Sequence, residues 1–398
     1  MKALFGLPGE VVFCKECVIS NQRPRSTVEF ANTPDEAKET IAFGEDGICE
    51  ACKFNKEKNS EIDWDARESQ LLEVLDRFRR SSGYDVVVPG SGGKDSAYTA
   101  HVLKEKYGMN PLTVTWAPHL YTQIGWENFV NWSHVGGLDN ILFTPNGKLH
   151  RILTREAFVN LLHPFQPFIV GQRIIGPKIA EKFGISLIMY GENQAEYGNP
   201  IEENSTPLMQ ERFYSSKKNS EIRLGGRTIK ELTQLYDLGE KEFEPYLPID
   251  ISNSRSEVHY LGYYHKWDPQ ECFYYAVENT GFIPAPERTQ GSYSKYSSLD
   301  DKIDPFHYYT TFIKFGLGRA SYDAAQEIRT GKITREEGIS LVAQFDSEFP
   351  SKYFKEFCDY IDLSEKEFSE IIDRNRSPHL WEKFNQEWTL RKAVWKGQ

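Results

Sequence analysis

The sequence predicts an α/β protein with a doubly wound parallel sheet, preceded by a cysteine-rich segment and followed by a mostly helical region. Three observations lead to this prediction. Strand and helix patterns alternate from residue 85 to 190, two Cys-x-x-Cys pairs precede residue 62, and helical patterns dominate after residue 308. Such alternation is typical of layered α/β domains. We expect three segments, over residues 1–62, 63–200 and 201–398.

The first strand-helix-strand unit has the strongest pattern. A helical stretch over 63–80 leads into Asp85-Val86-Val87-Val88, an apolar run of the kind that is buried on both faces of a sheet. A glycine-rich turn follows directly. A helical pattern over 94–107 then ends at Gly108, and a second strand is expected over 112–116.

The alternation continues as far as residue 190. Further helices are expected over 126–134, 149–162 and 173–183, and further strands over 140–143 and 185–190. Beyond Gly198 the rhythm gives way to polar and tyrosine-rich stretches. Helical patterns return over 308–322 and in the acidic, aromatic C-terminal part.

Composition narrows the class of protein. The 398 residues carry 58 acidic and 47 basic side chains, so the net charge of −11 disfavours a nucleic-acid partner held through its phosphates. No apolar run approaches the roughly 18 residues that a membrane helix needs, and the first residues lack a signal-peptide pattern. We therefore expect a cytoplasmic protein without a membrane partner.

The cysteines predict a metal site in the N-terminal segment. Cys14 and Cys17 form one Cys-x-x-Cys pair, and Cys49 and Cys52 form a second. Two such pairs suit a tetrahedral ion, and we predict a structural zinc knuckle. An iron–sulfur cluster or a redox role is the alternative. The separate Cys272 and Cys358 are interpreted as buried apolar residues.

The glycine-rich turn predicts a phosphate site. Backbone N–H groups at the start of a helix attract anions, glycines allow close approach, and serine and lysine side chains add donors and charge. The groups concerned are Gly90, Ser91, Gly92, Gly93, Lys94, Asp95 and Ser96. The pattern departs from a Walker A loop, which has Ser or Thr where this chain has Asp95. We assign Asp95 to Mg²⁺ or nucleotide positioning. A turn without a ligand is the alternative.

The string Ser-Gly-Gly-Lys-Asp-Ser over 91–96 resembles the signature of the PP-loop ATP pyrophosphatases. That resemblance implies a HUP-like doubly wound domain that binds ATP and releases its pyrophosphate intact. It also implies that the adenosine lies near the second strand, where Thr115 is the candidate contact. Enzymes of this superfamily activate a carbonyl or amide oxygen as an adenylate.

The chain as a whole resembles the N-acetyl sugar amidotransferases of lipopolysaccharide and nonulosonic-acid biosynthesis. The resemblance lies in both cysteine pairs, the loop over 91–96, Tyr190-Gly191-Glu192, Glu196-Tyr197-Gly198, residues 299–304 and residues 307–320. It implies that ammonia replaces the acetamido oxygen of a nucleotide sugar, giving an acetamidino sugar, AMP and pyrophosphate. It further implies that a separate glutaminase and an ammonia-channel subunit supply the ammonia.

Other site residues are predicted from their positions. Gly191, Glu192 and Asn193 follow a strand at the carboxyl edge of the sheet, where such sheets bind ligands. The further candidates are Asp300, Asp301 and Asp304 for Mg²⁺, Lys314 and Arg319 for phosphates or the charge of the reacting carbon, and Arg173 for substrate. Solvated loops, a helix start and surface cations are the alternatives for these residues.

Two other functions fit parts of the sequence. A tRNA thiolase shares the loop and often carries zinc-binding cysteines, but it needs a basic face and commonly a reactive thiol. A non-catalytic zinc-knuckle module with an inert nucleotide domain is the second alternative. The intact Lys94 and Asp95 disfavour that module.

Overall fold

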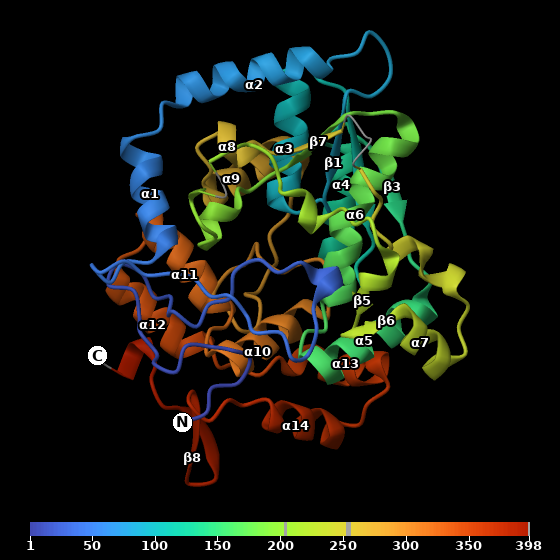
Figure 1. The fold of residues 1–398 in the computed structure, drawn as a ribbon. Coiled ribbons are helices and arrows are strands. Elements are labelled where there is room, and N and C mark those ends of the chain that lie inside the picture. The colour runs from blue at the N-terminus through green and yellow to red at the C-terminus, as the bar shows by residue number, and fades with distance from the viewer. Residues whose placement is uncertain (203–204, 252–255, 397–398) are drawn as a thin grey trace.

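A five-stranded parallel sheet forms the centre of the computed structural model, which describes residues 1–202, 205–251 and 256–396 (Figure 1). The strands lie in the order β3-β2-β1-β4-β7, and every neighbouring pair is parallel. Their bounds are β1 Val86–Pro89, β2 Pro111–Trp116, β3 Asp139–Phe143, β4 Leu187–Tyr190 and β7 Glu257–Tyr260. The predicted parallel sheet is confirmed.

Apolar side chains cover both faces of this sheet. Every residue of β1 and β2 is buried, and for β1 its continuous apolar run predicted this. Successive side chains point to opposite faces, so Val87 belongs to one core and Val86 and Val88 belong to the other. Helices α5 (Gly147–Leu161) and α6 (Gln166–Phe183) contribute to the first core. Helices α2 (Trp64–Phe78), α3 (Lys94–Glu105), α4 (Gln123–His134) and α9 (Pro269–Thr280) contribute to the second.

Two elements differ from the prediction. Helix α6 begins at Gln166 rather than near Arg173. Pro167 lies in its first turn, where a helix tolerates a proline, so this proline does not prevent the earlier start. Strand β7 lies past the expected boundary at residue 200, so the segment assigned to the helical region also completes the sheet. Its sequence Glu-Val-His-Tyr is not a continuous apolar run, since β7 is an edge strand.

The C-terminal region is mostly helical, as predicted. The expected helix over 308–322 is two helices, because Gly316 adopts a φ of +68° and ends the first of them. The larger helices are α10 Asp304–Phe315, α11 Arg319–Arg329, α12 Arg335–Phe345, α13 Phe354–Ile361 and α14 Glu365–Arg374. The shorter elements are α7 Ile229–Tyr236, α8 Leu261–Tyr264, and the strand pairs β5 Arg223–Leu224 with β6 Arg227–Thr228 and β8 Trp381–Phe384 with β9 Glu387–Leu390.

The N-terminal segment packs against the C-terminal helices. Its helix α1 (Glu50–Ser60) and its four cysteines share a buried cluster with residues of α11 and α12 (Figure 1). Leu7, Val11 and Phe30 join the core that α5 and α6 cover. The two ends of the chain therefore meet beside the sheet.

In the described part of the chain, no helix has both the length and the apolar character needed to cross a membrane.

Candidate active site

The glycine-rich turn lies at the carboxyl end of β1 and opens α3. Because β1 lies between β2 and β4, this turn is at the point where the chain crosses to opposite sides of the sheet, and ligands bind at such points in open α/β sheets. Gly93 caps α3, and the Ser96 hydroxyl donates to the Gly93 carbonyl over 3.0 Å. The first N–H groups of a helix lack intrahelical partners and point at the turn.

Gly92 fixes the shape of the turn. Its φ of +80° is a conformation that side chains disfavour, and a Cβ there would lie 2.9 Å from the Asn128 carbonyl oxygen on α4. Gly90 is also close-packed, since its Cβ would lie 2.1 Å from the Ser96 Cβ. Gly93 has room, because the nearest atom to its Cβ is the Ser91 Oγ at 3.7 Å.

Lys94 and Asp95 form an ion pair in the first turn of α3. The Lys94 Nζ donates to both Asp95 oxygens, over 2.7 and 2.6 Å. Burial alone would lower the pKa of Lys94, but Asp95 and Glu192 outweigh it and hold that pKa above its usual value. Lys94 therefore stays charged at neutral pH, as a phosphate contact requires.

Glu192 follows β4 and lies beside this pair. The pKa of Glu192 is raised to about 8, mainly by burial. The charge of Asp95 also raises this pKa, and its effect is larger than the opposite effect of Lys94. The Glu192 carboxyl group is then mostly neutral at pH 7 and can donate a hydrogen bond to an oxygen of a ligand. Of the three residues predicted after this strand, only Glu192 lines the main cavity. The Gly191 carbonyl accepts from the Gly262 N–H, and the Asn193 Oδ1 accepts from the Ala195 N–H.

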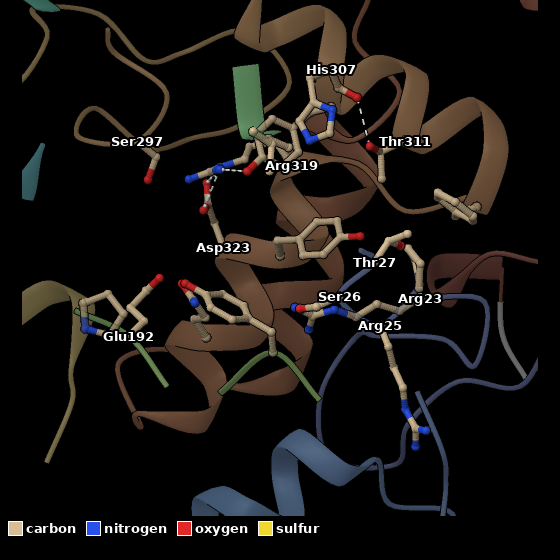
Figure 2. Close-up of a pocket in the computed structure, with 18 of the residues that line it drawn as sticks. Arg23, Arg25, Ser26, Thr27, Glu192, Ser297, His307, Thr311, Arg319 and Asp323 are labelled. Atoms are coloured by element: carbon tan, nitrogen blue, oxygen red, sulfur yellow. Dashed lines mark hydrogen bonds and ion pairs between the residues drawn. The ribbon is translucent and has the colours of Figure 1, made fainter. Parts of the chain in front are cut away.

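One cavity of about 470 Å³ brings together groups from all parts of the chain. Lys94, Asp95 and Glu192 line it from the sheet, Arg23 and Ser26 from the N-terminal segment, and α10 and α11 from the C-terminal region. Figure 2 shows Arg319 and Asp323 turned toward each other in this cavity, with Glu192 and the Arg23–Thr27 stretch on different sides of it.

Helix α11 presents one face to the cavity. The lining residues recur at helical spacing, at Arg319, Tyr322, Asp323, Gln326, Glu327 and Thr330. The Arg319 Nε lies 3.1 Å from an Asp323 oxygen, and its Nη1 donates to the Tyr308 hydroxyl. Despite burial, Asp323 and then Tyr308 hold the pKa of Arg319 above its usual value. Its charge is fixed in place for an anion.

Lys314 has a different environment from Arg319. Its Nζ donates to the Leu161 carbonyl over 2.8 Å and lies 4.9 Å from the centre of the Phe5 ring. Burial lowers the pKa of Lys314 to about 7. It lines the main cavity, but as an amine that is about half neutral at pH 7 rather than a permanent cation.

The three predicted acidic residues of the C-terminal region separate into two kinds. Asp300 lines a smaller cavity of about 140 Å³ with Ser91, Lys94 and Asp95. The Asp301 Oδ2 accepts from the backbone and the ring of His119, and its Oδ1 accepts from two more backbone N–H groups. These contacts engage both oxygens of Asp301, so its carboxylate is less open to a cation than that of Asp300, and its assignment to Mg²⁺ stays a prediction. Asp304 is buried and lines neither of these two cavities. Asp95 and Asp300, which line one cavity, are the better placed candidates.

Two predicted contacts lie outside both cavities. Thr115 is buried in β2, where its hydroxyl accepts from the Asn140 side chain over 3.0 Å. Arg173 lies on α6, with its guanidinium 6.0 Å from the Tyr190 ring centre and 3.9 Å from the Met209 sulfur. Neither residue is among those that line the two cavities around the loop.

The four cysteines fit a tetrahedral metal. All four sulfurs lie within 4.8 Å of one another, and among the described residues no other group of three or more candidate ligands does so. Sulfurs held ~2.3 Å from zinc are ~3.8 Å apart in a tetrahedron. The Cys17–Cys49 and Cys14–Cys52 distances are 3.8 and 3.9 Å. Arg335 donates to the carbonyls of Cys14 and Cys17, which ties the first pair to α12.

Several residues of the cavity were not predicted. They are Arg23, Glu29, Tyr296, His307, Tyr308 and Asp323. The polar and aromatic residues of α11 recur at helical spacing, and this spacing could have indicated a polar helix face. In the structure that face points into the cavity rather than to solvent. Arg23 carried no such signal, since the long-range fold alone brings the N-terminal segment to the cavity.

Comparison with known proteins gives one match to a family model. Residues 290–394 match the C-terminal domain described as LPS biosynthesis protein WbpG-like. This segment holds Arg319 and Asp323, so the matched domain supplies one wall of the cavity. The match supports the family resemblance drawn from the sequence.

Other comparisons add little to this match. No curated protein matches the chain. Among solved structures, NMN synthetase from Francisella tularensis is similar, with 13% identity over 32% of this chain and 54% of that chain and a TM-score of 0.25. The chain thus covers about half the length of that structure. The fold assignment rests on the strand order of the sheet.

Loss of one cluster cysteine should release the metal. We expect roughly one zinc per purified chain, and Cys14→Ser should lose both the zinc and thermal stability, because a Cys₄ site needs all four ligands. Elemental analysis and thermal unfolding test this expectation. Cys358→Ser, outside the cluster, should keep the zinc. Metal-free protein with unchanged stability would contradict the assignment.

Gly92→Ala should damage the loop, whereas Gly93→Ala should not. The alanine at 92 meets the Asn128 carbonyl and an unfavourable φ, so we expect a loss of ~1–3 kcal/mol in the free energy of unfolding. The alanine at 93 should cost less than ~1 kcal/mol because its methyl group has room. Urea unfolding of both variants measures the difference. Equal stability of the two variants would show that the turn tolerates a side chain at 92.

Glu192→Gln should stabilise the protein increasingly as the pH rises. A folded-state pKa of about 8, above the usual 4.5, means that the stability contribution of Glu192 is complete below pH 4.5 and is lost as the pH rises toward 8. Between pH 5.5 and 7.5 the variant should gain ~1.4 kcal/mol per pH unit relative to the wild type. Urea unfolding at both pH values tests this. For the control Glu336→Gln, at an exposed position, the difference in the free energy of unfolding from the wild type should be the same at pH 5.5 and at pH 7.5. A pH-independent difference for Glu192→Gln would refute the raised pKa of Glu192.

Proposed function

We propose that this protein is an ATP-dependent amidotransferase that converts the acetamido group of a nucleotide sugar into an acetamidino group, for surface-polysaccharide or nonulosonic-acid biosynthesis. One observation carries the proposal: the ATP-loop residues Lys94 and Asp95 share a cavity with Arg319, from a segment that matches a lipopolysaccharide-biosynthesis domain. ATP chemistry and a sugar-related domain thus meet at one site.

The reaction has two steps with defined leaving groups. The acetamido oxygen attacks the α-phosphorus of ATP, an oxygen–phosphorus bond forms, and pyrophosphate leaves. Ammonia then adds to the activated carbon, the carbon–oxygen bond breaks, and AMP leaves with the former amide oxygen. The product is a protonated amidine, so two of the three protons of ammonia stay on the new nitrogen and the third leaves with AMP. The loop holds the departing pyrophosphate through backbone N–H groups and the charge of Lys94.

Other cavity residues have complementary roles in this proposal. Arg319, held by Asp323 and Tyr308, would stabilise the phosphate of the AMP leaving group. The neutral carboxyl of Glu192 would donate to an oxygen of the same group. Asp95 and Asp300 would hold Mg²⁺, which supplies charge neutralisation for the phosphates when it is bound. The zinc would be structural, since a Cys₄ site leaves no open position.

The proposed partners and location follow from the family resemblance. A separate glutaminase and a channel-forming subunit would supply ammonia, and the protein would act in the cytoplasm. A tRNA thiolase is less well supported, because it needs a reactive thiol. Burial raises the pKa of Cys272 well above its usual value and that of Cys358 to about 11, so neither forms a thiolate readily.

Pyrophosphate release tests this function. With ATP, Mg²⁺, ammonium and an acetamido nucleotide sugar, we expect pyrophosphate and a product about one mass unit lighter than the sugar, because NH replaces oxygen. Lys94→Ala should lower the rate at least ~100-fold, since a phosphate contact in the transition state is lost. Lys148→Ala, at an exposed position of α5, should retain full activity. An unchanged mass for every acetamido sugar, or full activity of Lys94→Ala, would refute the proposal.

A further inference from the structure

Arg23 is a buried cation on the N-terminal wall of the main cavity. The residue is only 3% exposed, and it follows the first cysteine pair by a few residues. Its guanidinium carbon lies 4.7 Å from the Tyr322 ring centre and 5.6 Å from the Tyr197 ring centre. Within the described ranges, its side chain makes no hydrogen bond or ion pair with another residue.

The other arginines and lysines discussed around the cavity have partners within the protein, a carboxylate for most of them and the Leu161 carbonyl for Lys314. Lys94 pairs with Asp95, and Arg319 pairs with Asp323. Arg25, two residues along the chain, makes two hydrogen bonds to the Glu50 carboxylate, so its charge is neutralised by α1. Arg23 thus differs from these neighbours, because among the described residues its side chain has neither an ion-pair partner nor a hydrogen-bond partner.

A buried and unpaired guanidinium is costly unless a ligand balances its charge. The two tyrosine rings contact Arg23 as a cation over an aromatic face, which leaves its N–H groups available at the edge of the guanidinium plane. That planar fork matches the oxygens of a phosphate. The hydroxyls of Ser26 and Thr27 lie on the same wall and make no hydrogen bond to the described residues, so they can add donors.

In the proposed function, the phosphates of ATP bind elsewhere in the cavity. They belong at the loop after β1, with Lys94 and the start of α3, whereas Arg23 comes from the N-terminal segment on another side of the cavity (Figure 2). A second anion site in the same cavity therefore calls for a second anionic molecule, which is the co-substrate.

We propose that Arg23, with Ser26 and Thr27, binds the phosphate that links the sugar substrate to its nucleotide. The inference rests on the proposed function in taking the co-substrate to be a nucleotide sugar, and it assigns the place of that molecule's phosphate in the cavity. It also gives the cysteine-rich segment a direct part in substrate binding.

Binding measurements test the role of Arg23 independently of turnover. The full-length protein, saturated with a non-hydrolysable ATP analogue, is titrated calorimetrically with UDP-N-acetylglucosamine and CMP-N-acetylneuraminate, and with the two free sugars. Arg23→Gln is compared with the wild type, with Arg23→Lys and with Arg25→Gln, which removes a neighbouring charge that already has a partner. Zinc content and thermal unfolding of each variant verify the fold, and the affinity for the ATP analogue is measured separately.

We expect at least one nucleotide sugar to bind the wild type and Arg23→Gln to raise its Kd at least tenfold. Arg23→Lys should fall between the two, Arg25→Gln should match the wild type, and the Kd for the ATP analogue should stay unchanged. Equal affinity of wild type and Arg23→Gln, or the absence of binding by either nucleotide sugar, would overturn the proposal. An equal loss for free N-acetylneuraminate would also overturn it, by assigning Arg23 to the sugar carboxylate. Because pyrophosphate release is not the readout, failure of the amidotransferase reaction is distinguished from failure of this site.

Discussion

The position of β1 between β2 and β4 is the constraint on which the whole site depends. A parallel sheet brings the carboxyl ends of its strands to one edge, and the reversal of strand order at β1 leaves room there for a ligand. The turn after β1 and the residues after β4 therefore face the same space. This arrangement sets Lys94, Asp95 and Glu192 close enough for the charge of Asp95 to raise the pKa of both Lys94 and Glu192.

Both ends of the chain are needed to enclose that space. The sheet supplies only one wall of the cavity, while the N-terminal segment and α10 and α11 supply the rest. Charges are balanced locally in this interior, as in the contact of Arg319 with Asp323 and Tyr308. Such pairing is what allows ionised groups to remain far from bulk water. Arg23, whose side chain has no ion-pair partner among the described residues, is where we propose that a ligand supplies one.

The sequence predicted those features that local physics determines. Strands β1 to β4, the turn with Gly92 and the cysteine pairs follow from strand-helix alternation, backbone demands and ligand chemistry within short windows. Strand β7 was not predicted because an edge strand does not need a continuous apolar run. The acidic stretch did not reveal that an oxygen of Asp301 contacts His119, which is far away in sequence. The cavity lining from Arg23 depends on long-range packing, which no local pattern encodes.

Helix α11 is an element with two interior faces. On one side Ala324 and Ala325 pack against the cysteine cluster, and on the other Arg319 and Asp323 point into the cavity. Because a helix moves as a rigid unit, a displacement of α11 at the cysteine cluster also displaces the face of α11 that lines the cavity. The integrity of the four-cysteine cluster is thereby coupled to the position of the Arg319 side chain in the cavity, by a route that does not pass through the sheet.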